Sequence, residues 1–218
     1  MESCMSSKIV VVNSYNKTYE EIKNVTSAHN QQYFDKYNIE YISRRNDLID
    51  DVAINCYDKF EMITSLLHER SDIDYIWSMD VDIVICDFNI DIRVFTKLSK
   101  RDILFSSVDE CDPNMFWNIN AGSIIFKNSP TTRSIMKYYM KIGRETKIND
   151  QVLWQIILMR SSKFRSCCGI FPKNAFNHGE KDQFLVHDMS ATSTTASSQK
   201  AAVVKLESIK RIINEIRR

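Results

Sequence analysis

Two carboxylates two residues apart, Asp80 and Asp82, lie between the apolar runs Tyr75–Met79 and Ile83–Ile85. The first run is typical of a buried strand, and the second is either its continuation or the start of another strand. Carboxylates at the exit of a buried strand are costly to remove from water without a positive partner. Because carboxylate oxygens suit Mg²⁺ or Mn²⁺, we predict that Asp80-Val81-Asp82 holds a divalent cation. Such a cation could bind a diphosphate and neutralise the charge that develops when a sugar leaves it.

The spacing alone is a weak signal, because Asp72 and Asp74 have the same spacing eight residues earlier. That earlier pair follows the polar segment Glu69-Arg70-Ser71, and we assign it to a solvated loop. The apolar surroundings distinguish Asp80 and Asp82 from it. The alternative for Asp80 and Asp82 is a strand end that carries two hydrated carboxylates.

Two further side chains have types that suit a site for a cation and an anion. His187 follows the apolar run Phe184–Val186, and we predict it as a third metal ligand through a neutral imidazole. The alternative is an edge histidine whose ring nitrogens are satisfied by hydrogen bonds. Lys59 lies in the first part of a helix that opens at Cys56. A cation there opposes the helix dipole, so we expect Lys59 to bind an anion.

A second block, from Trp117 to Phe126, combines side chains that commonly contact sugars. The Asn118 and Asn120 amides can donate to and accept from hydroxyl groups, and the Trp117 ring offers a face to a pyranose. We interpret Asn120-Ala121-Gly122 as a tight polar corner before a buried strand, with the glycine allowing a positive φ or a close approach of ligand. The alternative is an ordinary β-turn.

A candidate catalytic carboxylate, Asp150, precedes the apolar helix Val152–Met159 and is followed by Gln151. Asp150 is placed to face a reacting centre, and the alternative is that it only caps the helix. Asn120 is the second residue that we count as a catalytic candidate.

Polar residues also follow the first two predicted strands, where ligands bind in open α/β sheets. Asn13 and Tyr15 follow Ile9–Val12, and we expect them to contact a nucleobase or ribose. Arg44 follows Ile39–Ile42 and could meet a phosphate. Ordinary turn and loop positions are the alternatives for all three.

The composition restricts the possible classes of protein. A chain of 218 residues with 44% hydrophobic residues predicts one domain with a full core. A net charge of +1 gives no indication of a nucleic-acid partner or an anionic membrane surface. With only 4 glycines the chain has no glycine-rich phosphate loop, so metal, Lys and Arg must bind any phosphate. The alternation of strands and helices predicts an α/β fold with a mixed, mainly parallel sheet.

We predict a domain over residues 1–189, a Ser/Thr/Ala linker over 190–200 and an amphipathic helix over 201–218. That helix has apolar residues at helical spacing, including Val204 and Ile209, and could pack on the domain, on a partner or on a membrane surface. The six cysteines have neither zinc nor disulfide spacing. Without a recognisable signal or transmembrane anchor, we expect a cytoplasmic protein, in the host cytoplasm if it is viral.

The ordered motifs together resemble the metal-dependent glycosyltransferases of the GT-A fold, a Rossmann-like single domain. The resemblance extends to the galactosyl/mannosyltransferase family of the yeast Golgi and plant xyloglucan enzymes, and to small glycosyltransferases encoded by large algal viruses. It covers roughly residues 8 to 190 and implies Mn²⁺ or Mg²⁺ at Asp80, Asp82 and His187. The implied donor-binding residues are Asn13, Tyr15, Arg44, Lys59, Asp80, Val81 and Asp82. The implied sugar and acceptor residues are Trp117, Asn118, Ala121, Gly122 and Gln151.

We therefore expect transfer of a hexose from a nucleotide sugar, with a UDP-sugar favoured, to a glycan, glycoprotein or other hydroxyl acceptor. Asp150 would be a general base in an inverting enzyme, and would stabilise the sugar cation or act as nucleophile in a retaining one. One alternative is a metal-dependent nucleotidyl- or phosphotransferase, which also uses paired carboxylates. Another is a sugar-binding module with a decayed site, since Lys181-Asp182-Gln183 departs from the Gly-Asp that is usual in the family. The oligomeric state stays open.

Overall fold

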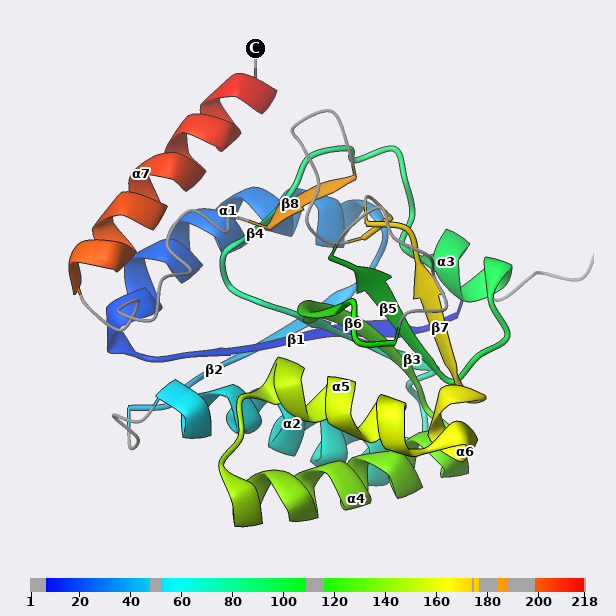
Figure 1. Cartoon of the computed structure of the whole chain (residues 1–218). Helices are drawn as coiled ribbons and strands as arrows, with labels where there is room; N and C mark the ends of the chain where they lie inside the picture. Colours follow the sequence, from blue (N-terminus) through cyan, green and yellow to red (C-terminus); the bar gives the residue numbers. More distant parts are fainter. Residues whose placement is uncertain are drawn as a thin grey trace, which may run out of the picture.

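A six-stranded mixed sheet in the order β2-β1-β3-β6-β5-β7 forms the centre of the protein (Figure 1). Strands β2, β1 and β3 run parallel, β6 is antiparallel to β3 and β5, and β7 is parallel to β5. A separate antiparallel pair joins β4 and β8. This arrangement confirms the predicted α/β class with a mixed, mainly parallel sheet. The computed structural model describes residues 7–47, 52–108, 116–173, 175–176, 184–187 and 199–217.

The elements alternate along the chain much as the hydrophobic periodicity predicts. The strands are β1 (Ile9–Tyr15), β2 (Glu40–Arg45), β3 (Tyr75–Met79), β4 (Ile83–Ile85), β5 (Ile103–Ser107), β6 (Ile119–Lys127), β7 (Cys168–Phe171) and β8 (Leu185–His187). The helices are the 3-10 helix η1 (Lys17–Tyr19), α1 (Glu20–Lys36), α2 (Val52–Glu69), α3 (Arg93–Leu98), α4 (Pro130–Thr146), α5 (Asp150–Arg160), α6 (Ser162–Arg165) and α7 (Gln199–Ile216).

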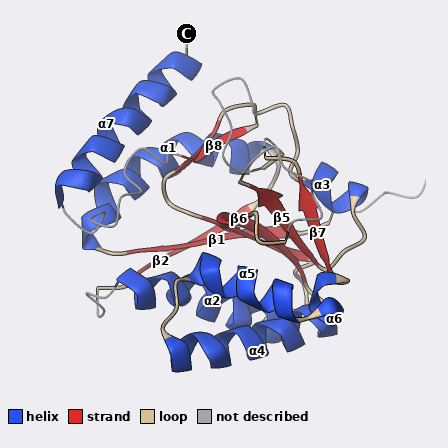
Figure 2. Ribbon diagram, viewed as in Figure 1, coloured by secondary structure: helices blue, strands red, loops and turns tan. Residues whose placement is uncertain are grey.

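Helices cover both faces of the sheet (Figure 2). Val10 and Val12 of β1 pack into one core with residues of α2, α4 and α5, including Trp154. Ile9 and Val11 point the other way, into a core with α1 and α3. A strand buried on both faces needs an unbroken apolar run, which explains the β-branched sequence of β1.

The C-terminal helix α7 packs beside α1 and β4 rather than standing apart (Figure 1). Its buried apolar side chains meet Ile22 of α1 and Val84 of β4. The expected stripe is partly wrong, because Val204 is exposed. The residues that pack inward are Ala202, Leu206, Ile209 and Ile213. Residues 190–198, where we predicted most of the linker, lie outside the described part of the chain.

Two local expectations are corrected by the strand and helix boundaries. Asn120-Ala121-Gly122 is not a corner but lies inside β6, where Asn120 pairs with Ser106 of β5. No glycine in the described ranges has a positive φ, so Gly122 is needed for another reason. Helix α2 begins at Val52, which places Lys59 in its middle, so the helix-dipole argument does not apply to it.

Arg44 lies within β2 rather than after it, because that strand continues to Arg45 in register with Tyr15 of β1. The strands that we predicted at Ile9–Val12 and Tyr75–Met79 and the helix that we predicted at Val152–Met159 are present, with small shifts at their ends. No helix in the described residues is long and apolar enough to cross a membrane.

Candidate metal and donor site

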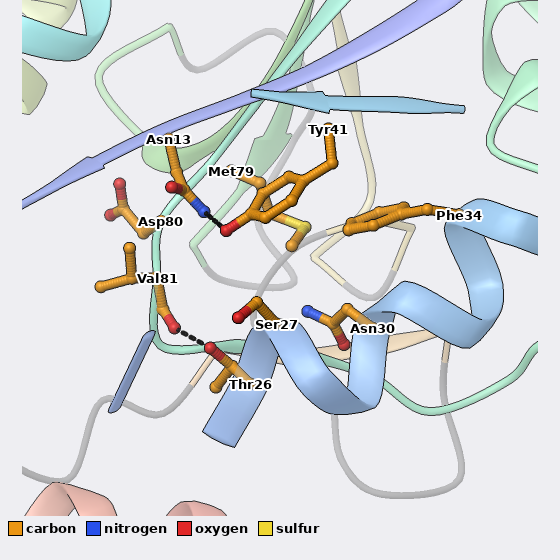
Figure 3. Close-up of a pocket in the computed structure, with 9 residues that line it drawn as sticks. All are labelled: Asn13, Thr26, Ser27, Asn30, Phe34, Tyr41, Met79, Asp80 and Val81. Atoms are coloured by element: carbon orange, nitrogen blue, oxygen red, sulfur yellow. Dashed lines mark hydrogen bonds between the residues drawn. The ribbon is translucent and has the colours of Figure 1, made fainter. Parts of the chain in front are cut away.

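Asp80 and Asp82 lie in the tight turn that joins β3 to β4, at the carboxyl end of β3. Helix α1 holds this turn through side chains (Figure 3). Thr26 Oγ1 donates to the Val81 carbonyl at 2.6 Å. Asn30 donates to the Ile83 carbonyl and accepts from the Ile85 N–H, each at 2.9 Å. Buried hydrogen bonds from side chains to the backbone fix the turn that carries the two carboxylates.

His187 completes a three-residue group with the two aspartates. It lies on β8 directly opposite Ile83 of β4, so the β4-β8 pairing sets its position. Its Nε2 is 3.3 Å from Asp82 Oδ1 and 3.9 Å from Asp80 Oδ2. One possible ligand atom from each of the three residues lies within 4.8 Å of the others. Two carboxylates and an imidazole form a set of metal ligands that fits Mn²⁺ or Mg²⁺, with water or substrate oxygens as further ligands.

Two lysines bind the remaining oxygens of these carboxylates. Lys59 Nζ lies 2.6 Å from Asp80 Oδ1, and Lys205 of α7 pairs with Asp82 Oδ2. Each carboxylate therefore directs one oxygen toward His187 and the other toward an ammonium group. This division leaves the three ligand atoms facing one another while the charge of each aspartate is partly balanced.

The charges inside this cluster change the pKa values of its members. Burial alone would raise the pKa of Asp82, but the attraction of His187 and Lys205 holds that pKa below its ordinary range. Burial alone would lower the pKa of His187, and the carboxylate of Asp82 outweighs that effect and raises it. In the ion cluster of Asp80, Asp82, His187, Lys59 and Lys205, the Asp82 carboxylate is thus stabilised by both His187 and Lys205.

Asp150 lies at the start of α5, on the other side of Lys59, with its Oδ2 3.5 Å from Lys59 Nζ. It is buried, and burial raises its pKa against the opposing attraction of Lys59. The capping alternative is not its role, because Asn149 is the N-cap residue and accepts from the backbone N–H of Gln151. Lys59 therefore links the predicted metal site to the predicted catalytic carboxylate.

The middle of β6 forms the wall next to Lys59. The Lys59 ammonium donates to the Ala121 carbonyl at 3.3 Å, and Gln151 Oε1 accepts from the Ala121 N–H at 3.3 Å. Asn120 Oδ1 accepts from the Gly122 N–H at 2.6 Å. The structure thus brings these three residues of β6 next to the ion cluster, although their expected turn is absent.

The predicted donor-binding residues of the first two strands have partners of their own. The Asn13 amide donates to the Tyr41 hydroxyl at 2.8 Å (Figure 3). Its oxygen accepts from the Ser43 hydroxyl. Arg44 pairs with the buried Asp58. Tyr15 is half-buried at the end of β1. A narrow pocket lies between Asp80 and these strands and is lined by Asn13, Thr26, Ser27, Asn30, Phe34, Tyr41, Met79, Asp80 and Val81 (Figure 3).

The two remaining predicted sugar contacts precede β6. The residue Trp117 is 54% exposed, and its backbone carbonyl accepts from Gln155 of α5 at 2.6 Å. Asn118 is buried, and its Nδ2 has no hydrogen-bond partner among the described residues.

Sequence reasoning missed three residues of this site, Lys205, Thr26 and Asn30. The two polar residues of α1 resemble ordinary helix-surface positions, and nothing local indicates that they bind the β3-β4 turn. Lys205 had a detectable signal, because it lies on the same helical stripe as Ala202 and Ile209. A lysine on a buried stripe requires a carboxylate partner.

No protein-family model matches the chain, and a search of curated protein sequences finds no significant match. Solved structures are similar in fold. A glycosyltransferase involved in the glycosylation of the major capsid of PBCV-1 superposes with a TM-score of 0.69 at 15% identity, covering 94% of this chain and 99% of the other. The galactosyltransferase LgtC, in complex with donor and acceptor sugar analogs, superposes with a TM-score of 0.54 at 12% identity, covering 92% and 95%.

These similarities extend over nearly the whole of each chain. The chain therefore has the GT-A fold of glycosyltransferases.

Proposed function

We propose that the protein is a glycosyltransferase that moves a hexose from a nucleoside-diphosphate sugar, with a UDP-sugar favoured, to a hydroxyl group of a glycan or glycoprotein. One observation carries the proposal: Asp80, Asp82 and His187 converge at the carboxyl end of β3, within a fold that known glycosyltransferases share. Ligands of open α/β sheets bind at that end.

The two aspartates and His187 would hold Mn²⁺ or Mg²⁺, which when bound neutralises the diphosphate that leaves the sugar. Lys59 keeps the Asp80 carboxylate oriented by binding its Oδ1 atom. Asn13 and Tyr15 would contribute to donor binding, with the Asn13 amide keeping or exchanging its hydrogen bond to the Tyr41 hydroxyl.

Asp150 is our candidate for the carboxylate at the reacting carbon, because it is buried and lies close to Lys59. In an inverting reaction it would take the proton of the acceptor hydroxyl, for which a raised pKa is suitable. In a retaining reaction it would stabilise positive charge on the sugar. Asn120 and Gln151 border the same space, and the exposed Trp117 ring would stack on the acceptor.

The known proteins of this fold support sugar transfer over phosphate transfer. One is named for the glycosylation of a capsid protein and the other is a galactosyltransferase with sugar analogs bound. A glycan or glycoprotein acceptor and a hexose donor are consistent with those activities.

The test is a screen of nucleotide sugars with MnCl₂, measured first by thermal shift and then by donor hydrolysis. We expect one donor to raise the melting temperature and to release its sugar and nucleoside diphosphate. The double variant Asp80→Asn/Asp82→Asn should lose both effects. Asp72→Asn/Asp74→Asn is the matched control, because that pair has the same spacing but lies apart from the site, with Asp72 bound by Lys8 and Arg70.

Product analysis decides between the candidate reactions. Release of a nucleoside monophosphate with a sugar phosphate would assign the protein to phosphoryl transfer instead. Hydrolysis that persists in Asp80→Asn/Asp82→Asn, or in excess chelator, would contradict the metal site.

A further inference from the structure

Lys205 is the member of the ion cluster that comes from farthest away along the chain. It is separated from Asp82 by 123 positions, and its side chain is only 7% exposed. Its ammonium also lies 6.0 Å from the centre of the Tyr19 ring of η1. The apolar contacts of α7 with Ile22 and Val84 hold it in place. Burying a lysine costs free energy that pairing with a carboxylate often does not repay, so the buried position of Lys205 requires an explanation.

The charges of the site give that explanation. Asp80, Asp82 and Asp150 face two ammonium groups, Lys59 and Lys205, so these five ionised side chains together carry one net negative charge. Addition of a divalent cation makes the cluster positive by one charge. Without Lys205 the same cation would leave the cluster neutral. Lys205 therefore repels a lone metal ion and, once the metal is bound, attracts an anion.

We propose that Lys205, carried by the C-terminal helix α7, makes divalent-cation binding and diphosphate binding interdependent at this site. The inference rests on the proposed function, because it assumes that the site takes a metal and a nucleoside diphosphate. It adds that α7 belongs to the donor site and that the metal binds tightly only together with the diphosphate. Reciprocal coupling of this kind is a free energy shared between two ligands.

The two carboxylate oxygens of Asp82 allow a metal and Lys205 to bind at the same time, so α7 can stay in place. Lys205 binds Oδ2 of Asp82, whereas His187 lies near Oδ1. A metal can approach the three facing ligand atoms while Lys205 keeps its own contact. The lysine then acts through charge and through the orientation of Asp82, which makes it a positioning residue.

The experiment compares the full-length protein with Lys205→Met by isothermal titration calorimetry. The first titration measures the affinity for MnCl₂ alone, and the second measures the affinity for UDP at saturating MnCl₂. We expect Lys205→Met to bind Mn²⁺ alone about tenfold more tightly and UDP about tenfold more weakly, within the 5- to 150-fold range of typical couplings. Structural damage would weaken both, so opposite changes identify the charge effect.

Two further variants serve as controls. Lys205→Arg retains the charge and should restore both affinities toward those of the wild type. Lys210→Met removes a lysine of the same helix that pairs with Glu207 on its exposed face, and should change neither affinity. Circular dichroism confirms folding of each variant.

Equal affinities in Lys205→Met and the wild type, or a parallel loss of both, would overturn the inference while leaving the metal site intact. If neither protein binds Mn²⁺ with or without UDP, the metal-dependent function fails first and the inference fails with it. The two failures are therefore distinguishable.

Discussion

Gly122 lies against the imidazole of His187 so closely that no side chain fits between them. A Cβ atom added at Gly122 would be 2.4 Å from Cε1 and 2.7 Å from Nδ1 of His187. The carbonyl of Gly122 also accepts from the Asp80 N–H at 2.7 Å. One residue of β6 thus contacts two of the three predicted metal ligands, and close approach rather than a positive φ explains the glycine.

We predict that Gly122→Ala displaces His187 and weakens Mn²⁺ binding by about 10- to 100-fold, the usual effect of disturbing the support of a metal ligand. Gly143→Ala is the matched control, because a Cβ there would be 2.2 Å from Tyr57 Cε1, away from the metal ligands. Both variants should lose about 1–3 kcal/mol of stability through overpacking. Calorimetric Mn²⁺ titration separates them, and an unchanged affinity in Gly122→Ala would show that His187 is not a ligand.

The support of the β3-β4 turn by α1 gives a second prediction. Asn30→Ala leaves the Ile83 carbonyl and the Ile85 N–H without their side-chain partner, and should cost about 1–3 kcal/mol in urea unfolding. Mn²⁺ affinity should fall as well, because the turn carries both aspartates. Gln31→Ala, which removes only an exposed bond to Asp35, is the control. A stability loss with full Mn²⁺ affinity would mean that the turn keeps its shape without α1.

The raised pKa of Asp150 gives a prediction for the pH dependence of stability. Between its ordinary value of 3.8 and the raised value, the folded state holds a proton that the unfolded state has lost. The contribution of Asp150 is therefore fully present at low pH and is lost as the pH rises through the folded pKa. Asp150→Asn should gain stability relative to the wild type over that interval, measured by urea midpoints from pH 4 to 8 without metal.

Asp72→Asn supplies the opposite sign as a control for that measurement. Hydrogen bonds from Arg70 and Lys8 hold the pKa of Asp72 below its ordinary range, so its contribution is present at neutral pH and lost toward acid. Its variant should therefore approach wild-type stability as the pH falls. A constant difference between Asp150→Asn and the wild type at all pH values would contradict the raised pKa.

The exposed Trp117 ring gives a prediction for the acceptor. Trp117→Ala should raise the acceptor KM by about tenfold, equivalent to about 1.4 kcal/mol of lost aromatic contact, while donor hydrolysis without acceptor stays unchanged. Tyr138→Ala removes another exposed aromatic residue, on α4, and should change neither quantity. A fall in donor hydrolysis in Trp117→Ala would place the ring at the donor instead.

The local sequence predicted much of the framework for physical reasons that act within a few residues. Val10 and Val12 belong to an unbroken apolar run, and only a strand covered on both faces buries such a run. Asp80 and Asp82 stand out because apolar strands flank them on both sides. Where the local pattern was ambiguous, as at Asn120 and Gly122, a turn and a bulged strand have the same composition, and pairing with β3 and β5 decided between them.

The sequence by itself determined the α/β class, the aspartate pair and the candidate carboxylate Asp150, because apolar periodicity and the placement of charged residues are local properties. Only the tertiary structure decided which cations balance those carboxylates. Lys59 reaches Asp80 across 21 positions and Lys205 reaches Asp82 across 123. Such pairs form because buried charges need partners, and the packing of distant segments decides which charges meet. A local sequence pattern does not indicate which residues will pair.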